Sequence, residues 1–174
     1  MSQGKDQILP LGDSSPLETL LDALFAACRE YYAVHLVSLV IFGSVGRGTP
    51  RPDSDVDILI VAEDLPQGRL RRADEFRLVE NALAPVLAEL GAAGRAVELS
   101  PVFKTPGELA QGSLLLLDMI QDARVLYDRG GFFSATLAQF KARLEKLHAR
   151  RIWRGDAWLW DLKPDYRVGE VFEL

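Results

Sequence analysis

Two aspartates stand two residues apart at the start of an apolar run, in SDVDILIV from Ser54 to Val61. Side chains alternate across a strand, so Asp55 and Asp57 are expected on one face and Val56 on the other. Two carboxylates this close repel each other, and a divalent cation turns that repulsion into attraction. The pair therefore suggests a site for Mg²⁺ and a nucleotide, because Mg²⁺ takes its remaining ligands from waters and phosphate oxygens. Aspartates also flank strands as turn formers, so the pair alone leaves both interpretations open.

A glycine-rich turn precedes these aspartates, in FGSVGRGTPRPD from Phe42 to Asp53. Gly43 follows an apolar run directly, and glycine lets backbone N–H groups approach a ligand closely. The hydroxyl of Ser44 and the neighbouring amides can donate to phosphate oxygens, and Arg47 adds positive charge. The turn is neither a Walker A loop, since no Lys-Ser/Thr pair closes it, nor a dinucleotide fingerprint, since its glycine spacing differs from G-x-G-x-x-G.

Taken together, Gly43-Ser44, ten intervening residues and Asp55-x-Asp57 resemble the signature of the DNA polymerase β-like nucleotidyltransferase superfamily. The fuller pattern GSxxRGxxxxxSDxD is similar to that of its small bacterial and archaeal members, the minimal nucleotidyltransferases. That group commonly has alanine where this chain has Gly46. The resemblance implies a nucleotidyltransferase fold, an α+β two-layer arrangement in which helices pack on a small mixed β-sheet. It also implies that Gly43, Ser44 and Arg47 bind the nucleotide.

A third carboxylate from a neighbouring strand completes the metal site in that superfamily, and the candidate here is Glu98 in RAVELSPVF. Val97 and Leu99 would face one side of the strand, which leaves Glu98 on the other, where the aspartates could be. The alternative is that this strand has one solvent-facing side and that Glu98 points to water. The usual residue is aspartate, so the glutamate is a departure from the pattern. Asp118 and Asp122 are fallback candidates, but they lie in or beside a predicted helix and are expected to be exposed.

The resemblance implies transfer of a nucleoside monophosphate to an acceptor hydroxyl, with Asp55, Asp57 and Glu98 as catalytic and metal-binding residues. Two Mg²⁺ ions are expected during turnover, and ATP is the expected substrate because related minimal proteins resemble adenylyltransferases. The acceptor stays open between a partner protein, in an antitoxin-like role, and a small molecule, although drug-modifying relatives generally carry a larger extra domain. The alternative is a weak or inactive module of this fold that neutralises or scaffolds a protein partner.

The elements that must position these residues alternate between helix and strand. Capping-box patterns at Ser15–Glu18 and Thr105–Glu108 predict two helix starts, the second for a helix over 109–121. Further helices are predicted over 69–90, where Pro85 threatens a kink, and over 132–151. Strands are predicted over 36–42, 58–61, 95–103 and 124–127. The expected organisation is a flexible lead-in (1–13), a nucleotidyltransferase domain (14–128), and a C-terminal helix with a Trp-rich tail packed on it (129–174).

Composition narrows the class of protein. The 174 residues carry a net charge of −5, which argues against a protein that coats nucleic acid and makes nucleic acid an unexpected partner. The longest apolar runs are far shorter than the roughly 20 residues that span a bilayer, and the N-terminus lacks the pattern of a signal peptide. Cys28 is the single cysteine, which fits the reducing cytoplasm.

All three tryptophans, Trp153, Trp158 and Trp160, lie near the C-terminus, after a basic run over 141–154. One interpretation is that the tail docks these aromatic side chains against the domain and fastens the last helix. The other is a surface for an acceptor or a protein partner, because tryptophan and arginine are enriched at interaction hot spots. The sequence leaves both interpretations open.

Overall fold

The computed structural model describes residues 15–51, 54–155 and 157–172. The lead-in predicted for residues 1–13 falls outside these ranges. Four strands form one mixed sheet in the order β3-β2-β1-β4, in which β2 and β3 are parallel and the other neighbours are antiparallel. Their bounds are β1 Leu36–Phe42, β2 Val56–Ala62, β3 Leu99–Lys104 and β4 Arg124–Asp128.

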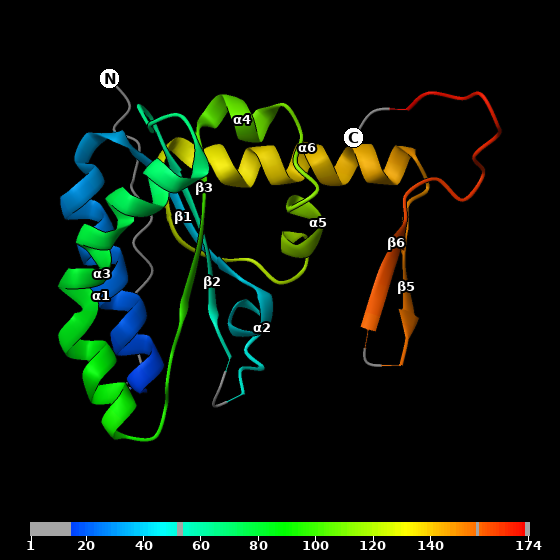
Figure 1. Ribbon diagram of the computed structural model, residues 1–174. Helices are drawn as coiled ribbons and strands as arrows, with labels where there is room; N and C mark the ends of the chain where they lie inside the picture. Colours follow the sequence, from blue (N-terminus) through cyan, green and yellow to red (C-terminus); the bar gives the residue numbers. More distant parts are fainter. Residues whose placement is uncertain (1–14, 52–53, 156, 173–174) are drawn as a thin grey trace.

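Helices pack on both faces of this sheet. Helices α1 (Pro16–Tyr32) and α3 (Arg69–Ala92) cover one face and lie side by side in Figure 1. The other face is covered by α4 (Pro106–Ala110), α5 (Leu116–Met119) and α6 (Phe132–Lys146). The remaining helical turns are η1 (Ala33–His35), α2 (Gly43–Gly46) and η2 (Arg129–Gly131). The predicted α+β class, a small mixed sheet with helices packed on it, is confirmed, and the helices form a layer on each face.

The two central strands are apolar because both of their faces are covered. All seven residues of β1 are buried, and β2 is buried throughout except at Asp57. Ile58 and Ile60 contact the core beneath α1 and α3, whereas Leu59 and Val61 contact the core beneath α4–α6. By alternation, Asp57 lies on the same face as Leu59, the α4–α6 side of the sheet.

Both helix starts predicted from capping patterns are confirmed. The Ser15 hydroxyl oxygen accepts from the backbone N–H of Glu18 at 3.3 Å, and Thr105 and Glu108 form a complete capping box. Pro85 lies within α3 without ending it. In the described part of the chain, no helix combines the length and apolar character that crossing a bilayer requires.

Three element bounds differ from the sequence prediction. The helix expected over 109–121 is two short helices, because Gly112 between them takes a positive φ of 93°. The final helix ends at Lys146 rather than near Arg151, because His148 takes a left-handed φ of 54° and turns the chain. The strand expected from residue 95 begins only at Leu99, so Glu98 precedes it.

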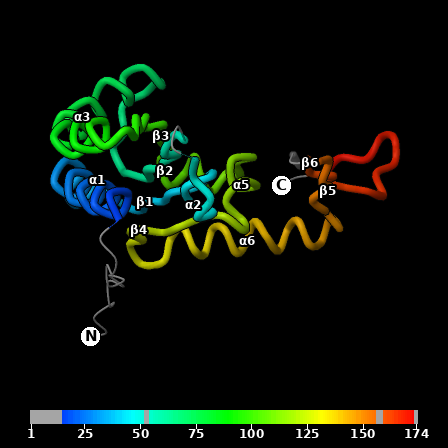
Figure 2. The backbone as a smooth tube through the Cα atoms, turned by 90° about the horizontal axis from the view of Figure 1, so that it is seen from below, coloured from blue at the N-terminus to red at the C-terminus, as the bar shows by residue number. Residues whose placement is uncertain are grey.

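Helix α6 carries a hairpin beyond the sheet. The Asp128 carboxylate fixes the helix start by accepting from the backbone N–H groups of Phe133 at 2.8 Å and Ser134 at 3.0 Å. After α6, strands β5 (Arg150–Arg154) and β6 (Ala157–Asp161) pair antiparallel as a separate two-stranded sheet. Figure 2 shows α6 running past the edge of the sheet, with this hairpin at its far end.

Candidate active site

The motif lies where β1 and β2 meet. Phe42, the last residue of β1, is paired in register with Asp57 near the start of β2. The chain leaves β1 into the single turn of α2, so Gly43 and Ser44 follow immediately beside that pair. Two segments more than ten residues apart in sequence are therefore brought to one end of the two central strands.

Gly43 brings the turn close to Asp57. Its φ is +66°, a conformation that favours glycine, and a Cβ built on it would lie 2.0 Å from Oδ2 of Asp57. Any side chain at this position would collide with the carboxylate. Because the first N–H groups of a helix have no partner within it, the turn presents backbone donors near this carboxylate.

The carboxylates of Asp55 and Asp57 repel each other. Asp55 is exposed and Asp57 is half-buried. Burial raises the pKa of the Asp57 carboxyl, the charges of Asp55 and Asp118 raise it further, and Arg47 lowers it. The protein alone thus disfavours the charged form of Asp57, which is the form that a cation or a cationic side chain would stabilise.

Asp118 and Asp122 lie beside the motif, and the expectation that they would be exposed is confirmed for Asp118 and wrong for Asp122. Asp118 is exposed on the single turn of α5, whereas Asp122, which follows that turn, is partly buried. Arg47 Nη1 donates to Asp122 Oδ2 at 3.1 Å. Partial desolvation raises the pKa of the Asp118 carboxyl, although Arg151 and Arg47 oppose the shift.

Arg151 reaches the same cluster from the C-terminal hairpin, and the sequence did not single it out as a site residue. Its Nη1 donates to Gln121 Oε1 at 2.7 Å, and its Nη2 lies 3.8 Å from Asp122 Oδ2. Two guanidinium groups, one from the glycine-rich turn and one from the hairpin, therefore flank one carboxylate.

Close packing explains why this chain has Gly46 where minimal nucleotidyltransferases commonly have alanine. A Cβ at this position would lie 2.2 Å from the backbone oxygen of Asp122 and 2.9 Å from that of Ile41. The segment after α5 packs so closely on α2 that only glycine fits between them.

Glu98 is exposed and lies one residue before β3. Val97 and Leu99 pack against the α1–α3 core, so alternation places Glu98 on the Asp57 side of the sheet. Its backbone oxygen accepts from the Val56 N–H at 2.8 Å. Within the described ranges, no three acidic, histidine or cysteine side chains are grouped closely enough to hold a metal ion. The structure therefore brings Asp55 and Asp57 together and leaves Glu98 near them without completing a three-carboxylate group.

Comparison with known proteins decides the family. Residues 21–106, which include the whole motif, match the family model of the nucleotidyltransferase domain. Residues 21–106 form a nucleotidyltransferase domain. The resemblance stated from the motif is confirmed, and the chain is an enzyme of the nucleotidyltransferase type.

Individual proteins are similar to this chain. A protein of Methanocaldococcus jannaschii, provisionally named a protein adenylyltransferase, is 27% identical over 137 residues, which cover 78% of this chain and 88% of that protein. A spectinomycin adenyltransferase from Enterococcus faecialis, solved with ATP and spectinomycin, superposes with a TM-score of 0.51 at 11% identity. This match covers 75% of the present chain and 65% of that one. A toxin–antitoxin structure with AMP-PNP matches 73% of this chain and 91% of its own, with a TM-score of 0.40 and 19% identity.

The nucleotidyltransferase domain match ends before several residues of the site. Asp118, Asp122 and Arg151 all follow residue 106. The motif thus lies within the matched domain, whereas the residues that flank it come from the rest of this chain.

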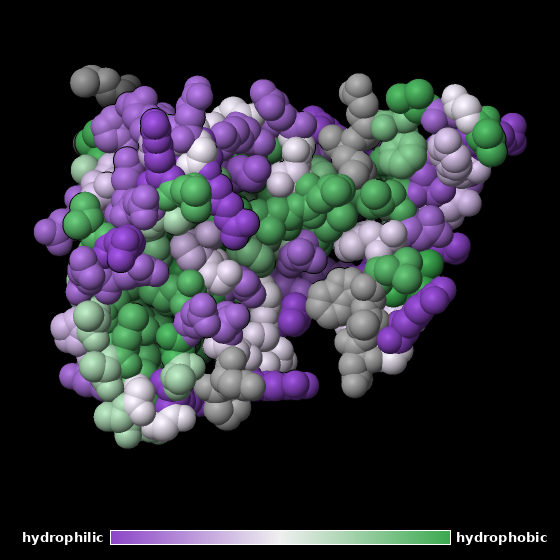
Figure 3. Space-filling model, viewed as in Figure 1, coloured by the Kyte–Doolittle hydropathy of each residue, from purple (hydrophilic) through white to green (hydrophobic). Residues whose placement is uncertain are grey.

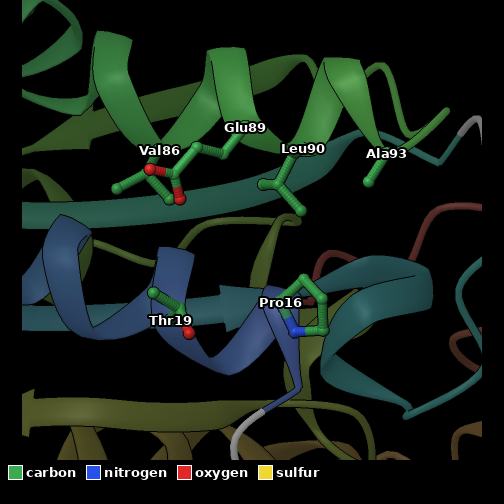
Figure 4. Close-up of a pocket in the computed structure, with 6 residues that line it drawn as sticks. All are labelled: Pro16, Thr19, Val86, Glu89, Leu90 and Ala93. Atoms are coloured by element: carbon green, nitrogen blue, oxygen red, sulfur yellow. The ribbon is translucent and has the colours of Figure 1, made fainter.

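Other cavities lie away from the motif. One, of about 250 Å³, opens between the start of α1 and the end of α3, where Pro16 lies opposite Leu90 and Ala93 (Figure 4). Another, of about 450 Å³, lies between the start of α3, the edge strand β3 and α4. Neither is lined by a residue of the motif.

Proposed function

We propose that this nucleotidyltransferase moves AMP from ATP, in a Mg²⁺-dependent reaction, to a hydroxyl group on a protein. The relative from M. jannaschii supports both the adenylyl group and the protein acceptor, because its name assigns it to the protein adenylyltransferases. The reaction would take place in a compartment that supplies ATP, and the cytoplasm fits. Burial raises the pKa of the Cys28 thiol to about 12, so the thiol stays protonated and unreactive at neutral pH. A free, unreactive thiol is compatible with the reducing cytoplasm.

One observation carries the proposal, namely the contact between Gly43 and Asp57. The turn that we propose to bind phosphate lies against Asp57, which supports one nucleotide meeting both the turn and the carboxylate pair. Gly43 and Ser44 would donate backbone N–H groups, and Ser44 its hydroxyl, to the terminal phosphates of ATP. Arg47 would add positive charge if the phosphates drew it from Asp122.

The donor set fits Mg²⁺. Asp55 and Asp57 offer hard carboxylate oxygens, and Mg²⁺ is commonly held by one or two carboxylates plus substrate phosphates and waters. When bound, the ion would neutralise the phosphates and stabilise the charge that develops at the α-phosphorus. Asp55 and Asp57 would hold it, and we retain Glu98 as the proposed further ligand for the second ion expected during turnover.

The proposed reaction is an in-line displacement. A bond forms between the acceptor oxygen and the α-phosphorus, and the bond from that phosphorus to the bridging oxygen of the β-phosphate breaks. Pyrophosphate leaves, and the acceptor hydroxyl loses its proton. The part played by Gly43, Ser44 and Arg47 is to fix the triphosphate so that the α-phosphorus faces the acceptor.

Calorimetric titration tests the proposal. We expect the wild type to bind α,β-methylene-ATP, which cannot be cleaved at the bond in question, only when Mg²⁺ is present. The double variant Asp55→Ala/Asp57→Ala should lose this binding. It should remain folded, since it loses two like charges. The control is Asp64→Asn, which removes an exposed carboxylate elsewhere on the chain. Binding that is indifferent to Mg²⁺ and to the double substitution would contradict the proposal.

The exposed position of Glu98 favours a second candidate, a nucleotide-binding module that scaffolds or neutralises a partner protein with little turnover. An antitoxin-like role toward such a partner stays a prediction. The enzyme and the binding module can be separated by measuring pyrophosphate release from ATP when no acceptor protein is present and water takes its place. In an enzyme that uses Glu98, Glu98→Gln should abolish this release while Glu98→Asp retains it, and both variants should still bind the nucleotide. A weak module would release no pyrophosphate in any form.

A further inference from the structure

The β5–β6 hairpin depends on contacts with the rest of the chain. A lone two-stranded hairpin is marginally stable in water, so its orientation is set by what it packs against. Trp160 of β6 contacts the core beneath α4–α6, and Arg151 of β5 bonds Gln121 next to the motif. These two residues are cross-strand partners, so they share one face of the hairpin.

Trp153 shares that face. It lies two residues after Arg151 on the same strand, and the guanidinium carbon of Arg151 is 4.8 Å from the centroid of its ring. Arg151 also approaches Asp122, which accepts from Arg47 of the glycine-rich turn. A continuous set of contacts thus links the indole of Trp153 to the turn proposed to hold the phosphates.

The exposure of Trp153 distinguishes it from Trp160. Its side chain is 59% exposed, although it belongs to the face that is turned toward the body, whereas Trp160 is half-buried against the core. Figure 3 shows a notch between the body of the molecule and the projecting hairpin. The indole thus offers an exposed aromatic surface beside a polar site, and a planar ligand can pack on such a surface.

We propose that the indole of Trp153, braced by Arg151, is the surface on which the base of the nucleotide stacks. The inference rests on the proposed function, because the phosphates are assigned to Gly43 and Ser44. A nucleobase is planar and stacks on aromatic rings, and a guanidinium group on the same ring limits the ring's motion. Arg151 acts as a positioning residue, since it connects the ring to Asp122 and Gln121. The hairpin would thereby hold the base while the family motif holds the triphosphate.

Two ligands that differ by the nucleoside test this inference. In the presence of Mg²⁺, calorimetric titration compares α,β-methylene-ATP with inorganic tripolyphosphate on the full chain. Trp153→Ala should weaken binding of the nucleotide by roughly 5- to 150-fold, the range for one lost base–aromatic stack. It should leave tripolyphosphate binding unchanged, and Trp153→Phe should restore most of the lost affinity. Leu159→Ala, on the opposite face of the hairpin, is the matched control and should bind both ligands as the wild type does.

The outcomes separate the two proposals. If the wild type binds the nucleotide and Trp153→Ala binds it equally well, the stacking surface is refuted and the proposed function stands. Equal loss of both ligands in Trp153→Ala would also refute stacking, because the ring would then act by supporting the fold of the site. If the wild type binds neither ligand, the proposed function itself fails and the inference falls with it.

Discussion

Gly43 couples the two halves of the motif at the level of single residues. Gly43→Ala would place a methyl group 2.0 Å from Asp57 Oδ2, in a backbone conformation that alanine disfavours. We expect the free energy of unfolding to fall by about 2 kcal/mol or more, from strain and overpacking together. We also expect Mg²⁺-dependent nucleotide binding to be lost, since the turn or the carboxylate must move. Thermal unfolding and calorimetry measure the two effects.

Gly48 supplies the matched control for this prediction. Its φ is +73°, close to that of Gly43, but no atom lies within 4 Å of its built Cβ. Gly48→Ala should therefore cost only the conformational strain, about 1 kcal/mol, and retain nucleotide binding. If the two variants behaved alike, the contact with Asp57 would have no importance beyond backbone strain.

What the sequence could predict at this scale was local. Asp55, Asp57, Gly43 and Ser44 lie within one short stretch, and their spacing alone indicates a shared site. The partnership of Arg47 with Asp122 spans 75 positions, and that of Arg151 with Gln121 spans 30. Such pairs depend on how α5 and the hairpin pack against the sheet, and the periodicity of the sequence does not predict that packing.

Among the elements, one ion pair joins α3 to α4 beside the edge strand β3. Arg72 donates to both carboxylate oxygens of Glu108, at 2.7 and 2.8 Å, and to the backbone oxygen of Phe103 at 3.2 Å. This arrangement lowers the pKa of Glu108 from its ordinary 4.5 to about 2, mainly through the hydrogen bonds from Arg72. The pair therefore stabilises the fold above about pH 4.5, and this contribution disappears as the pH falls toward 2.

Glu108→Gln isolates this contribution, because glutamine can still complete the capping box with Thr105. At pH 7 the variant should be less stable by up to about 1 kcal/mol, a small value because the Glu108 side chain is 39% exposed. The difference from the wild type should shrink as the pH is lowered from 4.5 to 2, as measured by denaturant unfolding at each pH. Asp74→Asn, in an exposed pair with Arg77, should change little. A difference that stayed constant with pH would rule out the ionic origin.

The bounds of elements were predictable where a local signal marks them. Capping side chains fix the starts of α1 and α4, and the apolar run over 36–42 matches β1 because that strand is buried on both faces. The end of α6 was not predictable in this way. The sequence over 132–151 stays compatible with a helix, and the left-handed turn at His148 depends on the hairpin that follows and its packing on the body.

On the scale of the whole molecule, Arg151 provides a polar link between the hairpin and the body. It bonds Gln121 and approaches Asp122, while its side chain is only 11% exposed. Removal of the guanidinium should loosen the hairpin without unfolding the sheet, because the two cores lie around β1 and β2. Arg151→Gln should therefore speed amide hydrogen exchange over residues 150–161, by about tenfold for a loss near 1.4 kcal/mol, and leave β1 and β2 protected.

Arg154→Gln is the control, since Arg154 lies on the same strand but on the opposite face and is exposed. Its exchange pattern should match that of the wild type. If Arg151→Gln left the hairpin as protected as before, the apolar contacts of Trp160 alone would hold it. Faster exchange across the central strands as well would mean that the hairpin is part of the cooperative unit formed by the sheet.

The expected result, slow exchange in the sheet with fast exchange in the hairpin, would show that the body folds independently of a more mobile hairpin. The proposed transfer of AMP to a protein would then have a mobile hairpin beside the site, which could move to admit the acceptor.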